Sequence, residues 1–283
     1  MDLVELKIFK TVAEQGGITR AAAALHRVQS NVTTRVKQLE ARLGTQLFHR
    51  RGRKLVLSSE GKVLLAYAER LLSLSSEAQA AIKGHVPHGV FRLGTLESTA
   101  ATRLPQVLAR YHRAHPAVRL ELVTGTSGAL VDRVARGEIE AAFVAEPFAA
   151  KNLETQHAFT EELVLITPKT HARVRAPGDI DSRIVLAFTT GCSYRRRLEA
   201  WLGRSRVVAE RVMEYGSYHA MTACVAAGGG IAVVPRSVLA VVGAEGLVAI
   251  HPLPPQVAKA RTMLVWPRGH QSAALSTLRE ELR

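Results

Sequence analysis

Cysteine, acidic residues and long apolar runs are all scarce in this sequence. Only two of the 283 residues are cysteine, Cys192 and Cys224, too few for a disulfide framework and not spaced like zinc ligands. No stretch reaches the roughly 18 consecutive apolar residues of a membrane-spanning helix. The opening MDLVELKIFK lacks the charged segment and apolar core of a secretion signal. We therefore expect a cytoplasmic protein without membrane partners.

Acidic residues are outnumbered by basic ones. The chain has 24 Asp and Glu against 38 Lys and Arg, a formal net charge of +14. Residues 20–54 carry a net charge of +8, with Glu40 as the one acidic residue among them. This concentration indicates a polyanionic partner or an anionic ligand. The length and a hydrophobic content of 47% predict a globular protein of two or three domains.

The first 43 residues predict three short helices. Apolar residues recur at helical spacing from Leu3 to Val12, after which Gly16 and Gly17 can end the helix and Thr19 can cap the next one. The second helix is the alanine-rich RAAAALH, whose small side chains permit close packing. A turn then leads into a third helix, which together with the second forms a helix-turn-helix pattern.

The segment HRVQSNVTTRVKQLE, residues 26–40, predicts a helix with two different faces. One face is an apolar stripe of the kind that an amphipathic helix buries, made of Val32, Val36, Leu39 and Leu43. The opposite face has short hydrogen-bonding side chains and one lysine, namely Ser30, Thr33, Thr34 and Lys37. Because a solvated face more often carries Glu and Lys pairs, we expect this polar face to bind a partner.

A basic hairpin and a long helix are predicted next. Leu47 and Phe48 anchor the hairpin, basic residues surround its glycine, and KLVL reads as a strand. Ser58 or Ser59 then caps a helix with an apolar stripe of about five turns: Leu64, Tyr67, Ala68, Leu71, Leu74, Ala78 and Ile82. A helix of this length between two domains favours self-association. The alternative is that it packs on the three preceding helices.

Beyond the expected linker KGHVPHG, strands and helices alternate for nearly 200 residues. The strands expected are VFRLGTL, VRLELVTG, IEAAFVAE, ELVLITPK, RIVLAFTT, IAVVP, LVAIHPL and ARTMLVW. Such alternation predicts mostly parallel sheets with helices on both faces, in which ligands bind beyond the carboxyl ends of the strands. The length is sufficient for two small lobes.

The stretch ITRAAAALHRVQSNVTTRVKQLEARLGTQLFHRRGRKLVLSSEG resembles the winged helix-turn-helix signature of LysR-type transcriptional regulators nearly residue for residue. The resemblance extends over the whole chain, and Ser30 stands where many members have proline. It implies an α/β fold with an N-terminal, all-α-dominated winged helix-turn-helix domain at 1–58 and a dimerising linker helix at 59–84. A two-lobed, periplasmic-binding-protein-like α/β effector domain would follow at 90–283. Its first lobe would hold about 90–160 and 262–283, and its second lobe about 161–261.

The third helix is expected to enter the major groove of double-stranded DNA. Residues at its start offer short hydrogen-bonding groups to base edges: Gln29, Ser30, Asn31 and Thr33. Other residues are better placed to bind phosphates, which position the protein without reading sequence: Thr34, Arg35, Lys37, Arg50, Arg51, Arg53 and Lys54. The alternative is a basic solvated surface.

The resemblance also implies a small effector bound in a cleft between the lobes. It places four helix starts at this cleft, with the residues Ser98 and Thr99; Thr126 and Ser127; Cys192, Ser193 and Tyr194; Ser217 and Tyr218. Helix N-termini present unpaired N–H groups and a partial positive charge, which favours an anion. We therefore expect an organic acid or an amino-acid-like anion and no other cofactor. For each residue the alternative is ordinary helix capping.

Other functions are less consistent with the sequence. Cys192 beside Ser193 could be a nucleophile, but no G-x-S-x-G motif or positioned histidine accompanies it, so we do not expect an enzyme. A redox pair with Cys224, 32 residues away on an apolar helix side, is disfavoured as well. A solute-binding protein of a transport system would explain the lobes, but not the first 83 residues, and would need an export signal.

The family architecture implies the remaining partners. The long helix would pair two chains into a homodimer, and the effector domains would join dimers into a homotetramer. RNA polymerase is the expected protein partner of such a regulator.

Overall fold

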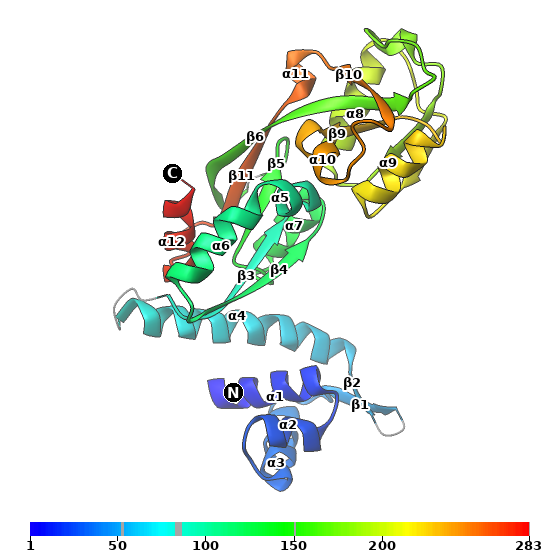
Figure 1. Cartoon of the computed structure of the whole chain (residues 1–283). Coiled ribbons are helices and arrows are strands. Elements are labelled where there is room, and N and C mark those ends of the chain that lie inside the picture. Colours follow the sequence, from blue (N-terminus) through cyan, green and yellow to red (C-terminus); the bar gives the residue numbers. More distant parts are fainter. Residues whose placement is uncertain (52–53, 83–86, 150, 283) are drawn as a thin grey trace. The chain divides into compact units, whose positions relative to one another are not determined.

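The computed structural model describes residues 1–51, 54–82, 87–149 and 151–282 (Figure 1). The chain forms two compact units, the first made of residues 1–86 with 136–138 and the second of 87–135 with 139–283. Among the described residues, no helix is long and apolar enough to cross a membrane. The expected linker at 83–89 falls partly outside the described residues, since description resumes at Pro87.

The first unit has three short helices, a hairpin and a long helix. Its elements are α1 (Leu3–Gln15), α2 (Ile18–Ala24), α3 (Gln29–Leu43), β1 (Phe48–Arg51), β2 (Lys54–Leu57) and α4 (Ser59–Ile82). Asp2 caps α1, because its Oδ1 accepts from the Glu5 N–H at 2.8 Å. Gly16 ends α1 in the left-handed conformation, at φ 61°. The prediction that Thr19 caps α2 is wrong: Gly17 is the cap residue, and Thr19 lies inside the first turn.

The apolar stripe of α3 builds the core of the first unit. Val32, Val36 and Leu39 are buried, as expected. Leu43 is the exception, with 41% of its surface exposed, because it stands in the last turn of the helix. A carboxylate ties α3 to the hairpin, since Glu40 Oε1 accepts from the Leu47 N–H at 2.8 Å.

Helix α4 has two apolar faces. Ser58 caps it, its Oγ accepting from the Gly61 N–H at 2.9 Å. On one face Ala68 is fully buried in the core of the first unit, with Leu64 and Leu65 packed against it. The alternative of packing on the preceding helices therefore holds for this face. A second set of apolar residues on α4 is exposed: Val63, Tyr67, Leu71 and Leu74.

The second unit is built on a long mixed sheet. Its strands are β3 (Gly89–Thr95), β4 (Val118–Thr124), β5 (Ala141–Ala145), β6 (Leu153–Pro168), β7 (Ile184–Ala187), β8 (Arg211–Glu214), β9 (Ala232–Pro235), β10 (Val248–Pro252) and β11 (Lys259–Pro267). Its helices are α5 (Glu97–Thr102), α6 (Leu104–Ala114), α7 (Ser127–Ala135), α8 (Ser193–Arg204), α9 (Tyr218–Ala226), α10 (Arg236–Val241), α11 (Pro255–Ala258) and α12 (Ala273–Glu281), with a 3-10 turn at Pro177–Asp179.

Strand pairing corrects the prediction of mostly parallel sheets. The main sheet has the order β10-β6-β11-β5-β3-β4, with β9 also on β6. Pairs β3–β4, β3–β5 and β7–β8 are parallel, whereas β6 and β11 pair with all their neighbours in the antiparallel sense. The prediction failed because an alternation of strands and helices does not reveal the direction of each strand in the sheet. Strand β11 runs antiparallel to both of its neighbours, β5 and β6.

Strand β6 carries the chain from one lobe to the other (Figure 1). Its residues 153–162 pair with β11, and residues 163–168 pair with β9 and β10. We define the first lobe as residues 89–162 and 259–282, and the second lobe as residues 163–258. Each lobe has its own buried cluster, around Phe91, Tyr111 and Trp266 in the first and around Tyr218, Val225 and Val234 in the second.

Candidate functional site

The start of α3 presents the polar side chains that were predicted to read bases. Gln29, Ser30 and Asn31 are exposed in the first turn, and Thr33 is half-buried. Thr33 Oγ1 donates to the Gln29 carbonyl at 2.9 Å, so its hydroxyl proton is used within the helix. Its lone pairs remain free to accept.

Two residues that were not predicted as part of the DNA-binding set hold this turn. Thr19 Oγ1 donates to Gln29 Oε1 at 3.3 Å, and Arg27 Nη1 donates to Asn31 Oδ1 at 3.2 Å. Each bond occupies the side-chain amide oxygen of Gln29 or Asn31, so their amide N–H groups remain available as donors. The spacing of Arg27 and Asn31, four residues apart, was the available signal for the second contact.

The residues predicted to bind phosphates lie on α3 and the hairpin. Thr34, Lys37 and Arg50 are exposed, and Arg35 is half-buried. Arg35 lies close enough to α1 to act on Asp2, whose pKa is lowered by the Glu5 N–H and by the Arg35 charge. Arg51 and Lys54 face each other in the hairpin register. Their side chains, and all of Arg53, lie outside the described residues.

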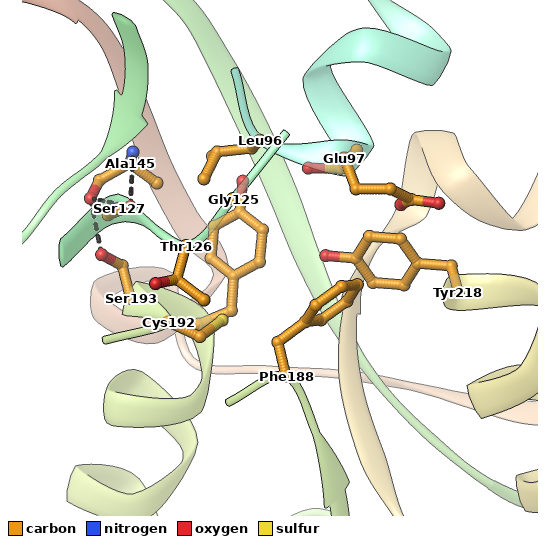
Figure 2. Close-up of a pocket in the computed structure, with 12 residues that line it drawn as sticks. Leu96, Glu97, Gly125, Thr126, Ser127, Ala145, Phe188, Cys192, Ser193 and Tyr218 are labelled. Carbon is orange, nitrogen blue, oxygen red and sulfur yellow. Dashed lines mark hydrogen bonds between the residues drawn. The ribbon is translucent and has the colours of Figure 1, made fainter. Parts of the chain in front are cut away.

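A cavity between the two lobes brings together residues from four helix starts (Figure 2). Predicted residues that line it are Ser98, Thr126, Ser127, Cys192, Ser193, Tyr194 and Tyr218. Thr99 and Ser217 are not among the lining residues. Residues that the sequence reasoning missed are Leu96, Glu97, Gly125, Ala145 and Phe188. Most of these follow or end a strand, so strand ends were the signal that could have found them.

Ser127 and Ser193 hold backbone instead of facing the cavity with free hydroxyls. Ser127 Oγ donates to the Ala145 carbonyl at 3.1 Å and accepts from the Ala145 N–H at 3.0 Å. Ser193 Oγ, from the second lobe, donates to the same carbonyl at 2.6 Å (Figure 2). Thr126 Oγ1 accepts from the Ala129 N–H at 3.4 Å, as a cap does. The Thr126 contact is ordinary helix capping, whereas Ser127 and Ser193 tie their helix starts to the end of β5.

Other polar groups in and beside the cavity make no hydrogen bond of standard geometry. Ser98 Oγ and the Tyr194 hydroxyl belong to residues that are 1% and 3% exposed, and neither makes such a bond within the described residues, although Ser98 and Thr262 lie near enough to Tyr194 to lower its pKa. The same holds for Thr99 Oγ1, Thr262 Oγ1 and Glu97 Oε2. An unsatisfied buried polar group costs about 1–3 kcal/mol. A cluster of such groups indicates a place where a polar molecule binds.

Burial keeps two tyrosines and a cysteine of the cavity in their neutral forms. It raises the pKa values of Tyr194 and Tyr218, so both phenols remain hydrogen-bond donors. Burial also raises the pKa of the Cys192 thiol and outweighs the N–H groups of Arg195 and Tyr194, which lower it. Cys192 and Cys224 are both free cysteines. A thiol that stays protonated is a poor nucleophile and a poor redox sensor.

The lobes touch at the rim of the cavity. The Gly128 N–H donates to the Gly191 carbonyl at 3.1 Å across the lobes. Gly191 has φ +96°, and a Cβ there would lie 2.9 Å from Thr126 Oγ1, which explains the glycine. The cavity holds about 20 Å³, room for about one water molecule. This conformation is therefore a closed one.

A half-buried ion pair of the first lobe lies beside the cavity and is bonded by a serine of the second lobe. Arg103, at the end of α5, donates from Nε to Glu161 Oε1 at 2.6 Å and from Nη2 to Oε2 at 3.1 Å. Ser237, at the start of α10 in the second lobe, donates to Glu161 Oε2 at 2.9 Å. Glu161 is 2% exposed and lies on β6. One carboxylate thus ties α5, β6 and α10 together.

Among the described residues, no cluster of His, Cys, Asp and Glu could hold a metal ion.

Comparison with known proteins places both units in one family. Residues 3–62 match the model of "Bacterial regulatory helix-turn-helix protein, lysR family", and residues 84–283 match "LysR substrate binding domain". The chain is 40% identical over 266 residues to the "Uncharacterized HTH-type transcriptional regulator YusT" of Bacillus subtilis, covering 94% of this chain and 89% of that protein. It is 36% identical over 266 residues to the transcriptional regulator GltR of the same species, covering 94% and 90%.

Solved structures share the fold over the full length. A full-length OxyR variant from Pseudomonas aeruginosa has a TM-score of 0.73 at 22% identity, covering 100% of this chain and 95% of that one. Full-length CbnR in complex with its target DNA has a TM-score of 0.70 at 23% identity, covering 100% and 99%. The helix-turn-helix match leaves the transport alternative without support, and the family is one of regulators, not enzymes. The chain belongs to the LysR family of DNA-binding transcriptional regulators with an effector-binding domain.

Proposed function

We propose that this regulator reads its operator through the first turn of α3 and responds to a small metabolite bound between the lobes of the second unit. Residues 1–58 would bind DNA, α4 would pair two chains, and residues 90–283 would bind the effector. The observation that carries the effector site is the convergence on one cavity of helix starts from both lobes, beside buried hydroxyls without partners.

The DNA-binding proposal assigns separate roles to α3 and the hairpin. Exposed amide and hydroxyl groups of Gln29, Ser30 and Asn31 would contact base edges. Thr33 would accept from them, while Thr34, Arg35, Lys37 and the hairpin residues Arg50, Arg51, Arg53 and Lys54 would meet phosphates. Support comes from the exposure of α3 and from the fold shared with CbnR, which was solved on its target DNA.

The effector proposal is a small organic acid or an amino-acid-like anion. The starts of α7, α8 and α9 present a partial positive charge to a carboxylate. The residues proposed to surround it are Ser98, Thr99, Thr126, Ser127, Cys192, Ser193, Tyr194, Ser217 and Tyr218. Because the cavity is closed, the Gly128–Gly191 contact would part to admit the molecule. Binding would change the spacing of the two DNA-binding units of a dimer.

Assembly and location complete the proposal. Two chains would pair through α4, and effector domains would join dimers into a tetramer that acts on RNA polymerase in the cytoplasm. The exposed apolar residues of α4 support the pairing.

A gel shift at two salt concentrations tests the DNA-binding part. The full chain is mixed with promoter fragments at low and moderate salt, as wild type and as Arg50→Ala. Removing one phosphate contact should weaken binding to all fragments alike and lower the salt slope by about one. Lys151→Ala, a lysine of the second unit, is the matched control and should leave the slope unchanged. Failure of the wild type to retain any fragment at low salt would overturn the proposal.

A further inference from the structure

The charge of the cavity lining differs from that of a site for a plain acid. Among the residues that line the cavity, Glu97 carries the only charged side chain, and no lysine or arginine is present. Arg103, beside the cavity, gives two N–H bonds to Glu161, and Arg195, which acts by charge on Cys192, bonds to Glu199 and Glu214. In the lining itself an anion would therefore meet a carboxylate and the partial charges of helix starts.

Glu97 reaches from the first lobe toward the start of α9 in the second lobe. Figure 2 shows its carboxylate extending over the Tyr218 ring. Burial raises the pKa of Glu97, while the Tyr218 N–H and the charge of His219 lower it. Its Oε2 is enclosed and has no hydrogen-bond partner among the described residues. A carboxylate oxygen accepts hydrogen bonds only, so the missing partner is a donor.

Two enclosed hydroxyls accompany this carboxylate. Ser98 Oγ and the Tyr194 hydroxyl lie near each other but make no hydrogen bond of standard geometry within the described residues, and both can donate or accept. Farther along the cavity lie the starts of α7 and α8, which have nine and twelve residues. The lining thus offers a carboxylate on one side and neutral hydroxyls in the middle. The other side has the partial positive charge of two helix starts, whose Gly128, Tyr194 and Arg195 N–H groups already bond to Gly191 and Cys192.

We propose that the effector carries a positively charged amino group that binds Glu97, in addition to an acid group that binds at the starts of α7 and α8. The chemical class is a small amino acid, and the corresponding acid without the amino group is selected against. A negative charge on Glu97 repels the plain acid and stabilises the ammonium through charge-assisted hydrogen bonds. This inference rests on the proposed function, in which the cavity is the effector site.

The test is a matched ligand panel on the purified full chain. The probes are the twenty protein amino acids, their 2-hydroxy acid counterparts, and the amines that lack the carboxylate, with calorimetry to measure Kd. We expect an amino acid to bind about tenfold or more tighter than its hydroxy acid, as a charge-assisted hydrogen bond implies. Its affinity should also rise with pH as Glu97 ionises.

Variants separate the role of Glu97 from general effects. Glu97→Gln should weaken amino-acid binding about tenfold and leave the hydroxy acid within about twofold. Glu245→Gln, an exposed turn residue of the second lobe, should change neither. Should Glu97→Gln fail to fold, the comparison of amino and hydroxy acids on the wild-type chain still tests whether the amino group contributes to binding.

The outcomes distinguish this inference from the proposal beneath it. Equal binding of amino and hydroxy acids, or amino-acid affinity unchanged in Glu97→Gln, overturns the amino-group assignment and leaves the effector site standing. A panel in which nothing binds overturns this assignment together with the effector part of the proposed function. Loss of DNA retention by the wild-type chain bears on the DNA-binding proposal alone.

Discussion

At the scale of single residues, Ser30 is the position where this chain departs from many relatives. It is exposed in the first turn of α3, between Gln29 and Asn31, where an N–H has no helical partner and proline would also fit. We expect Ser30→Ala to change the preferred DNA sequence in a selection from random fragments, because it removes one hydroxyl from the base-reading set.

Nonspecific affinity should stay within about twofold for Ser30→Ala, since phosphate contacts supply most of it. Ser59→Ala, at the start of α4, is the control and should keep the wild-type preference. An unchanged preference in Ser30→Ala would remove Ser30 from the base-reading residues.

His251 is a second residue with a testable consequence. It is 5% exposed, its Nδ1 accepts from the Val174 N–H at 3.1 Å, and its Nε2 lies 2.8 Å from Thr167 Oγ1. This arrangement needs the neutral ring, and burial, with the charges of His171 and Arg173, lowers the pKa of His251. Below its unfolded pKa of about 6.5 the unfolded chain binds more protons than the folded one, so stability falls with falling pH.

The measurement is Tm as a function of pH between about 7 and 5. We expect the wild type to lose Tm as the pH falls and His251→Gln to lose less over the same range. His112→Gln, an exposed histidine of α6, should keep the wild-type slope. Parallel curves for wild type and His251→Gln would contradict the assignment.

At the scale of elements, Glu161 decides how α5, β6 and α10 stay together. Its carboxylate accepts two bonds from Arg103 and one from Ser237. Glu161→Gln removes the charge but keeps the shape, leaving Arg103 with a neutral partner. Because Arg103 is 38% exposed, solvent screens part of the lost interaction. We expect the free energy of unfolding to fall by about 1–3 kcal/mol.

Urea denaturation of the full chain measures this loss. The neighbouring Glu162→Gln is a matched control, because Glu162 is 58% exposed and pairs at 3.3 Å with Arg236, itself 51% exposed. Exposed pairs contribute about 0–1 kcal/mol, so its effect should be small. Equal effects of the two variants would show that burial of Glu161 does not matter.

At the scale of the whole molecule, the exposed apolar side of α4 predicts the assembly. Val63, Tyr67 and Leu74 are 60%, 57% and 61% exposed, although they repeat at helical spacing. We expect Leu74→Glu to convert dimers into monomers in sedimentation experiments, because pairing would bury the new charge. DNA affinity should fall with it, since two linked units bind two half-sites.

Gln79→Glu is the control for this variant, because it adds the same charge at an exposed polar position of α4. It should remain dimeric. A dimeric Leu74→Glu would place the pairing surface elsewhere on the chain.

The amino-acid sequence by itself determined the local elements of the first unit. The helical spacing of Val32, Val36 and Leu39 specifies which side of α3 is buried, and α3 contacts the two helices that directly precede it in the chain. Periodicity also located most strands and the helix starts at the cavity, because capping and hydrophobic patterns are local. The spacing could not reveal the last-turn exposure of Leu43, which depends on what packs beside it.

Tertiary structure alone decided the direction of β6 and β11 and the contents of the cavity. Strand direction depends on pairing between segments about a hundred residues apart, such as Thr160 with Arg261. Glu97 of the first lobe and Phe188 of the second line the same cavity. Packing of the helix starts on β5 uses the hydroxyls of Ser127 and Ser193 on backbone, while Ser98 and Tyr194 make no hydrogen bond of standard geometry within the described residues. Which polar groups remain unpaired depends on long-range packing, and no local pattern in the sequence encodes it.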